Sequence, residues 1–110
     1  MRVHLIKRQS IEDFARAHAR ARVSLAEWLT KIKFADWENT HDIKRTFGTV
    51  DFLGKSSGRV VFDIGGNQYR LICKVVFGKS RVHLFVCWIG THAGYTQLCE
   101  NQSQFTVNLF

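Results

Sequence analysis

The stretch Val61 to Ile89, VFDIGGNQYRLICKVVFGKSRVHLFVCWI, decides the fold of this chain. It is rich in β-branched and aromatic residues, and two short segments typical of turns interrupt it, GGN at 65–67 and GKS at 78–80. The pattern predicts strands at Arg59–Ile64, Gln68–Phe77 and Arg81–Ile89. Val50–Leu53 is a weaker candidate for an earlier strand. The centre of the chain therefore predicts a sheet built from hairpins.

The segment before this sheet has a different periodicity. Val3 and Leu5 alternate with polar residues, as in a short first strand. Ser10 is predicted to cap a first helix, because apolar residues then recur at helical spacing. The pair Ser24 and Glu27 has the spacing of a capping box, which predicts a second helix with an apolar stripe at Leu25, Trp28, Leu29 and Ile32.

A third, short helix is predicted after residue 38, with Asn39 or Thr40 as its cap. The C-terminal segment CENQSQFTVNLF, residues 99–110, changes character from polar to alternating apolar residues. Two interpretations of this segment stay open, a loose strand and a disordered end that exposes apolar side chains.

Composition limits the class of protein. A chain of 110 residues with 45% hydrophobic residues suits one domain, and 16 Lys and Arg against 9 Asp and Glu give a net charge of +7. This charge favours a polyanionic partner such as nucleic acid or an acidic protein segment, and solubility alone is the alternative. Three cysteines without a C-x-x-C pair favour a reducing compartment and argue against zinc. Without a signal peptide or an apolar run of about 20 residues, the sequence predicts a cytoplasmic location.

Alternation in the predicted strands separates an apolar face from a basic one. The apolar face is predicted to carry Tyr69, Leu71, Cys73, Val75 and Phe77 with Val82, Leu84, Val86 and Trp88. The other side of the first strand is predicted to carry Arg70, Ile72, Lys74 and Val76, and that of the second Arg81, His83, Phe85 and Cys87; if the two sides coincide, they form one basic face. Together with Arg59, the cations of this basic face can bind the phosphates of a nucleic acid, and Phe85 can stack on a base. The alternative is a solvated face whose charges prevent edge aggregation.

Two short segments flank the basic face. The GGN segment is explained by its turn, because Gly65 and Gly66 supply the positive backbone φ that a tight hairpin needs and Asn67 tolerates the same region. The THAGY segment at 91–95 is predicted to be a loop at the end of the last strand. It would present His92 and Tyr95 beside the cations, where a histidine can transfer a proton near neutral pH.

The chain resembles the HigB toxins, RelE-like members of bacterial toxin–antitoxin pairs. The resemblance depends on the combination of VFDIGGNQYRLI at 61–72, the basic strand pair after it, and THAGY at 91–95. The resemblance runs from Met1 to about residue 96 and includes FADW at 34–37. It implies an α+β, RelE-like fold in which N-terminal helices pack on a twisted, mainly antiparallel sheet. We expect a toxin domain over residues 1–98 and a tail of uncertain structure over 99–110.

The resemblance also implies an activity, ribosome-associated cleavage of mRNA. In related nucleases the ribose 2′-OH attacks the adjacent phosphate, so neither a metal nor another cofactor is expected. Carried over residue by residue, Arg70 would stabilise the phosphate, His92 would act as general acid or base, and Tyr95 would stack or donate a proton. RNA contacts are expected from Arg59, Asn67, Lys74, Arg81 and His83. The implied partner is a helix-turn-helix, HigA-like antitoxin in a hetero-oligomeric complex.

Two positions depart from the family pattern, in which the residue matching Gly94 is commonly acidic and that matching Thr96 is commonly Asp. These differences bear on catalysis more than on fold. Two further functions therefore stay open: an RNA-binding or regulatory module that has lost turnover, and a structural domain whose charge serves a protein interface.

Overall fold

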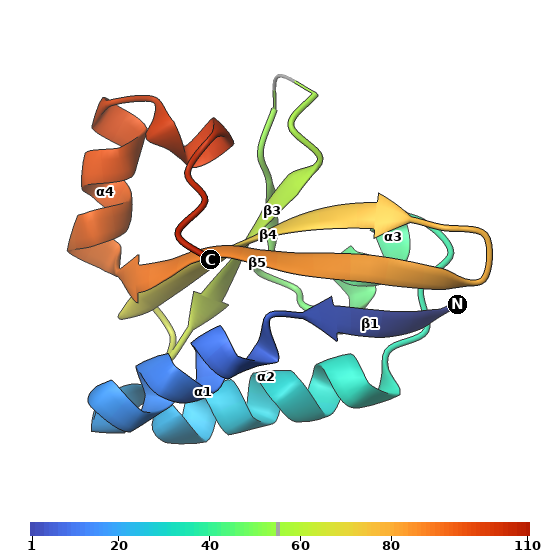
Figure 1. The fold of residues 1–110 in the computed structure, drawn as a ribbon, viewed down its shortest axis with the longest axis horizontal. Helices are drawn as coiled ribbons and strands as arrows, with labels where there is room; N and C mark the ends of the chain where they lie inside the picture. Colours follow the sequence, from blue (N-terminus) through green and yellow to red (C-terminus); the bar gives the residue numbers. More distant parts are fainter. Residues whose placement is uncertain (55) are drawn as a thin grey trace.

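Three long strands form the centre of the sheet, and they match the prediction closely. In the computed structural model, which describes residues 1–54 and 56–110, β3 (Arg59–Ile64), β4 (Tyr69–Phe77) and β5 (Arg81–Thr91) pair antiparallel. One edge is β1 (Arg2–Ile6), which runs parallel to β5, and the other is β2 (Asp51–Phe52), giving the order β1-β5-β4-β3-β2 (Figure 1). The predicted α+β fold with a mainly antiparallel sheet is confirmed.

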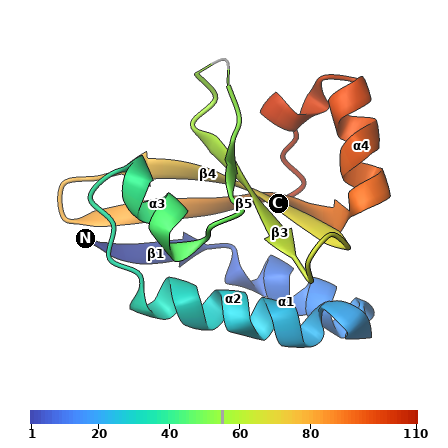
Figure 2. The ribbon, with the colours of Figure 1, turned by 180° about the vertical axis from the view of Figure 1, so that it is seen from behind.

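The helices lie on both sides of this sheet. α1 (Arg8–Ala17) and α2 (Arg22–Phe34), joined by a 3₁₀ turn at Ala19–Ala21, lie together along one side in Figure 1, and α4 (His92–Glu100) lies on the other. α3 (Thr40–Thr46) lies on the side of the sheet where β1 starts and is seen best in Figure 2. A second 3₁₀ turn, at Ser103–Phe105, follows α4.

Two predicted helix caps are wrong and one is confirmed. α1 begins at Arg8, ahead of Ser10, because the chain leaves β1 through Lys7 in a left-handed conformation with φ 71°. α2 begins at Arg22, directly after the 3₁₀ turn, so Ser24 lies inside its first turn and does not form a capping box. Asn39 does cap α3, since its side chain accepts a hydrogen bond from the N–H of Asp42 at 3.3 Å.

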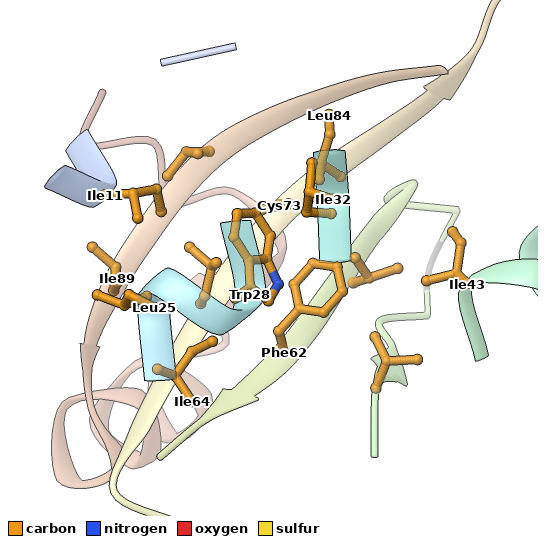
Figure 3. Packing of buried hydrophobic residues seen from close by; sticks show 14 of the residues in the cluster. Ile11, Leu25, Trp28, Ile32, Ile43, Phe62, Ile64, Cys73, Leu84 and Ile89 are labelled. Atoms are coloured by element: carbon orange, nitrogen blue, oxygen red, sulfur yellow. The ribbon is translucent and has the colours of Figure 1, made fainter. Parts of the chain in front are cut away.

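The main core lies between the sheet and the N-terminal helices. The buried side of α2 contributes Leu25, Trp28 and Ile32, and the Trp28 ring meets that of Phe62 edge-on at 5.4 Å between centroids (Figure 3). Leu84 from β5 has no exposed surface and packs in the same cluster. The predicted apolar face of β5 is therefore confirmed from Val82 to Val86.

A β-bulge then reverses the faces of β5. Ile72 pairs with Trp88 but the next residue, Cys73, pairs with Val86, so Cys87 is an extra residue in β5. Trp88 therefore joins the opposite face, against the prediction of a continuous apolar stripe, and Ile89 takes its place in the main core. Alternation fails here because one inserted residue shifts every later side chain to the other face.

The opposite face of the sheet carries a second, smaller hydrophobic cluster. Val61, Ile72 and Cys87 form its buried centre, and partly buried residues pack around them: Leu53, Trp88, Tyr95, Leu98 and Val107. α4 and the C-terminal segment thus cover part of the face predicted to be basic. The sequence predicted a loop at 91–95 and a tail of uncertain structure at 99–110, so it offered no cover from which to predict a second core.

The C-terminal segment is neither a strand nor a disordered end. The N–H of Leu109 donates to the carbonyl of Cys87 at 2.9 Å, and Nη1 of Arg59 donates to the carbonyl of Val107 at 2.6 Å. A second bond from the same nitrogen reaches the carbonyl of Gln104 at 3.3 Å. These bonds hold the segment on β3 and β5, and position 98, the predicted end of the toxin domain, falls within α4.

Candidate active site and RNA-binding face

The THAGY segment begins a helix, which corrects the prediction of a loop. β5 continues two residues beyond its predicted end, to Thr91, whose Oγ1 accepts a hydrogen bond from the N–H of Gly94 at 3.1 Å and caps α4. The N–H of His92 donates to the carbonyl of Gln68 at 2.9 Å. The helix start is therefore fixed to the GGN hairpin, and His92 lies exposed at that junction.

Thr96 holds the ring of His92 from one turn along the helix. Its Oγ1 lies 3.3 Å from Nδ1 of His92 and also donates to the His92 carbonyl at 3.1 Å. This position is one of the two departures from the family pattern. A neutral hydroxyl thus stands where the resemblance predicts a carboxylate, and it contacts the ring nitrogen of the histidine.

The other departure, Gly94, makes room for an indole. A Cβ added at Gly90 would lie 2.5 Å from Cζ2 of Trp88, and one added at Gly94 would lie 3.3 Å from the same atom. The Trp88 ring consequently lies against both glycines, and its centroid is 6.4 Å from that of Tyr95. Sequence reasoning missed Trp88 at this site because it assigned the residue to the other face.

The hydroxyl of Tyr95 is protonated at neutral pH. Partial burial raises the pKa of its hydroxyl well above the ordinary value, and a hydrogen bond with Cys99 raises that pKa further. The positive charge of Arg70 acts in the opposite direction, and the carboxylate of Asp51 raises the pKa. Arg70 pairs in register with Gly90, just before the helix that carries Tyr95, so the two side chains belong to the same end of the sheet.

Arg70 is already paired within the protein. Its Nε lies 3.1 Å from Oδ1 of Asp63, its Nη1 donates to the carbonyl of Tyr69 at 3.1 Å, and its Nη2 donates to Oδ1 of Asn67. Only 11% of its side chain is exposed. Sequence reasoning missed Asp63, although pairing the strands across the GGN turn places Asp63 directly opposite Arg70. The turn itself is as predicted, with φ of 65° at Gly65 and 67° at Gly66.

The remaining predicted RNA contacts lie farther along the same face. Lys74 is exposed and pairs in register with Phe85, and His83 pairs with Val76. Arg81 is exposed at the start of β5. The second hydrophobic cluster separates this group from Arg70 and His92, and the C-terminal segment engages Arg59. The structure therefore divides the predicted site into two ends, one with Arg70 and His92, the predicted catalytic residues, and a basic end with Lys74, Arg81 and His83.

A groove of about 410 Å³ lies at the basic end, and three cations reach it. Its lining residues are Lys7, Arg59, Lys74, Val76, Phe85, Val86, Cys87 and Asn108. Lys7 was not predicted as a site residue. Its position follows from the parallel pairing of Ile6 with Phe85, which places the next residue of the chain beside that phenylalanine.

The family comparison agrees with this architecture. Residues 21–98 match the family model described as HigB_toxin, RelE-like toxic component of a toxin-antitoxin system. The chain belongs to the HigB toxin family. The match begins at the start of α2 and ends within α4, so it includes all the strands that form the GGN hairpin and the basic face.

Individual relatives support the same assignment. This HigB-family chain is 28% identical over 96 residues to a protein named mRNA interferase HigB from Escherichia coli O6:H1, covering 87% of this chain and 91% of the relative. A structure described as a YoeB/ParE toxin from Agrobacterium tumefaciens superposes with a TM-score of 0.51 at 16% identity, covering 84% of this chain and 99% of the other. The second likeness supports the RelE-like fold alone.

Among its described residues, the toxin has neither a cluster of metal ligands nor a membrane-spanning helix. Over residues 1–54 and 56–110, no three His, Cys, Asp or Glu side chains are grouped so that they could hold a metal ion. Within the same residues, every helix is too short or too polar to cross a bilayer.

Proposed function

We propose that this HigB-family toxin is an mRNA interferase, an endoribonuclease that cleaves mRNA. The observation that carries the proposal is the grouping of His92, Tyr95 and Arg70 at one end of a basic sheet face, where the start of α4 meets the GGN hairpin. The name of the Escherichia coli relative, mRNA interferase HigB, supports the same reaction.

The chemistry that suits these residues is attack by the substrate's own ribose. The 2′-oxygen bonds to phosphorus and gives up its proton to His92, while the bond from phosphorus to the 5′-oxygen breaks. The leaving 5′-oxygen takes a proton from the hydroxyl of Tyr95, whose raised pKa keeps it protonated. The products are a 2′,3′-cyclic phosphate and a 5′-hydroxyl. Arg70 would stabilise the negative charge on the phosphate, and this route requires no metal ion.

The groove at the basic end would bind the neighbouring part of the RNA. Lys7 and Lys74 offer exposed ammonium groups to phosphates, and Phe85 between them offers a ring on which a base can stack. Arg59 lines the same groove, and Arg81 and His83 lie farther along the same face. Binding of this kind tolerates many sequences, because phosphates and ring faces carry little sequence information.

Two partners complete the proposal. A net charge of +7 on a chain of 110 residues suits the ribosome, whose surface is largely RNA, so cleavage would occur on translated mRNA in the cytoplasm. The cognate antitoxin would be a HigA-like helix-turn-helix protein that forms a hetero-oligomeric complex with the toxin.

The decisive experiment compares purified variants on programmed ribosomes with mapping of mRNA 5′ ends. His92→Ala should lower the cleavage rate by about 10²- to 10⁴-fold, since this is the usual contribution of a general acid or base. His41→Ala is the matched control, because His41 is an exposed histidine on α3 outside the site. Cleavage of naked RNA by wild type with and without EDTA tests whether a metal ion is needed. Cleavage of naked RNA compared with cleavage on programmed ribosomes tests whether the ribosome is needed. Full activity of folded His92→Ala would contradict the proposed mechanism.

The pairing of Arg70 favours a second candidate function, a catalytically weakened RNA-binding or regulatory module of the same fold. A guanidinium already bound to Asp63 and Asn67 has less capacity for a phosphate. Under this alternative, wild-type protein binds RNA but leaves mRNA 5′ ends unchanged at high soluble expression. The same 5′-end experiment therefore distinguishes the two functions.

A further inference from the structure

Thr96 makes two contacts with His92, and its hydroxyl can donate in only one of them. Oγ1 of Thr96 donates to the backbone carbonyl of His92 at 3.1 Å, and the same oxygen lies 3.3 Å from Nδ1 of the His92 ring. A threonine hydroxyl carries a single hydrogen, and a carbonyl oxygen can only accept. The hydrogen of Thr96 is therefore used by the carbonyl, and only the lone pairs of Oγ1 remain for the ring.

This count decides where the neutral ring carries its proton. A neutral imidazole has one nitrogen that donates and one that accepts. Because Oγ1 can offer only a lone pair, its contact with Nδ1 is a hydrogen bond when Nδ1 carries the hydrogen. We propose that Thr96 is a positioning residue that selects the tautomer of His92 with the proton on Nδ1, an inference that rests on the proposed function for its role in cleavage. The other ring nitrogen, Nε2, then has a free lone pair.

The start of α4 directs this second nitrogen away from the helix. His92 and Thr96 are four residues apart on α4, so their side chains lie on the same face of the helix, one turn apart. Nδ1 is the ring nitrogen nearer the backbone, and Nε2 lies at the outer end of the exposed side chain. Within residues 1–54 and 56–110, no protein group is hydrogen-bonded to Nε2. Its lone pair is therefore open to a substrate.

In the proposed reaction, Nε2 would be the atom of His92 that accepts the proton. The substrate 2′-hydroxyl transfers its proton to the lone pair of Nε2 while its oxygen bonds to phosphorus, and the ring becomes an imidazolium with both nitrogens protonated. Nδ1 donates to Thr96 before and after this transfer. The opposite tautomer would direct an N–H group at the substrate and leave its lone pair facing Thr96. The contact therefore favours His92 as the base, and the protonated hydroxyl of Tyr95 remains as the acid.

The size of the effect follows from the kind of hydrogen bond. The net contribution of one neutral hydrogen bond corresponds to a change of about 2- to 10-fold in an equilibrium constant. Thr96→Val keeps the branched shape of the side chain but removes the hydroxyl, so kcat for mRNA cleavage should fall by about 2- to 10-fold. KM should stay the same, because Thr96 acts on the ring and not on the substrate.

Two further variants separate tautomer selection from helix stability. Thr96→Ser keeps the hydroxyl and should cleave at the wild-type rate. Thr30→Val is the matched control, because Thr30 is an exposed threonine on α2 whose Oγ1 donates to the carbonyl of Ala26 at 3.0 Å. It loses the same type of bond to the carbonyl four residues earlier, but no histidine is involved. Thr30→Val should therefore cleave at the wild-type rate as well.

Nitrogen-15 NMR of histidine-labelled protein reads the tautomer directly, without any substrate. In wild type, the neutral ring of His92 should show a protonated Nδ1 and an unprotonated Nε2. In Thr96→Val, the two shifts should move toward the opposite tautomer, and in Thr96→Ser they should stay as in wild type. Circular dichroism confirms that the exposed substitutions leave the fold intact.

Three outcomes would overturn the inference: a protonated Nε2 in the neutral ring of wild type, unchanged ring shifts in Thr96→Val, or an equal loss of kcat in Thr96→Ser. Failure of the proposed function is a separate result. It would appear as absent mRNA cleavage by wild type, while the ring shifts would still differ between wild type and Thr96→Val.

Discussion

Arg70 and Asp63 lie directly opposite each other on β4 and β3, with 3.1 Å between Nε and Oδ1. The pair is only partly exposed, 11% for the arginine side chain and 26% for the aspartate. An ion pair with low exposure is screened less by solvent than one on the surface. Under the proposed mechanism, Asp63 would therefore compete with a bound phosphate for the Arg70 guanidinium.

Removing this carboxylate should release the arginine. Asp63→Asn should raise RNA affinity and steepen the dependence of affinity on salt by up to about 0.7 in the log–log slope, the value for one additional phosphate contact with a single strand. Fluorescence anisotropy with a labelled RNA measures both quantities. Asp13→Asn is the control, since Asp13 forms an exposed ion pair with Arg16 on α1. Weaker RNA binding in Asp63→Asn would show that Asp63 positions Arg70 rather than competes for it.

The assignment of the main core can be tested at Leu84. This side chain has no exposed surface, so Leu84→Ala should lower the free energy of unfolding by about 2 to 5 kcal/mol through lost burial and a residual cavity. Val76→Ala, at a position 40% exposed on the other face, should change it by less than about 0.5 kcal/mol. Urea unfolding measures both. Equal changes would contradict the placement of Leu84.

The contact between Trp88 and the glycines predicts a local effect on the site. Gly90→Ala places a Cβ 2.5 Å from Cζ2 of Trp88, so the ring must move away. We expect a stability loss of about 1 to 3 kcal/mol from overpacking and a changed near-UV circular dichroism spectrum. Gly48→Ala is the control, because a Cβ there meets nothing within 4 Å. An unchanged aromatic spectrum in Gly90→Ala would mean that Trp88 does not lie against the glycine in solution.

How much of this fold the sequence predicts depends on how local each feature is. β3 and β4 follow from alternation and from the GGN turn, and both are determined by neighbouring residues. The position of Trp88 depends on a bulge, which strand pairing rather than local sequence determines. The predicted caps at Ser10 and Ser24 were wrong for a similar reason. The path of the chain out of β1 determines where α1 begins, and the 3₁₀ turn determines where α2 begins.

The candidate site shows the same division. The residue types at His92 and Tyr95 point to proton transfer, but their placement on a helix could not be read from a segment without apolar periodicity. The cover over the second cluster depends on long-range contacts of the tail, such as Leu109 with Cys87. Asp63 is different, because hairpin register alone identifies it as the partner of Arg70.

The raised pKa of Tyr95 predicts a pH dependence of stability. From its ordinary value of 10.0 upward, the unfolded chain loses the tyrosine proton while the folded chain keeps it, so this residue destabilises the fold as pH rises above that value. Tyr95→Phe cannot ionise and should lose less stability than wild type between about pH 10 and 12. Urea unfolding of both proteins isolates the effect, since every other titrating group is shared. Parallel curves would contradict the burial of the hydroxyl.

The groove at the basic end leads to the last prediction, which concerns Lys7, a residue found only from the structure. If Lys7 and Lys74 each contact a phosphate on either side of Phe85, neutralising either one should weaken RNA binding for all sequences alike. Each change to Gln should also lower the salt slope by roughly 0.7 to 1, one counterion being released per contact. Phe85→Ala should lower affinity without changing the slope, because stacking releases no counterion.

Lys33→Gln separates a specific contact from a general loss of charge. Lys33 is an exposed lysine on α2, on the opposite side of the sheet, so its neutralisation changes the net charge equally but removes no phosphate contact. Anisotropy titrations from about 50 to 200 mM salt give the slope for each variant. If the salt slope falls for Lys74→Gln but not for Lys7→Gln, the RNA contacts the predicted strands but not Lys7. An equal fall for Lys33→Gln would mean that RNA binds through the net charge of the protein and not in the groove.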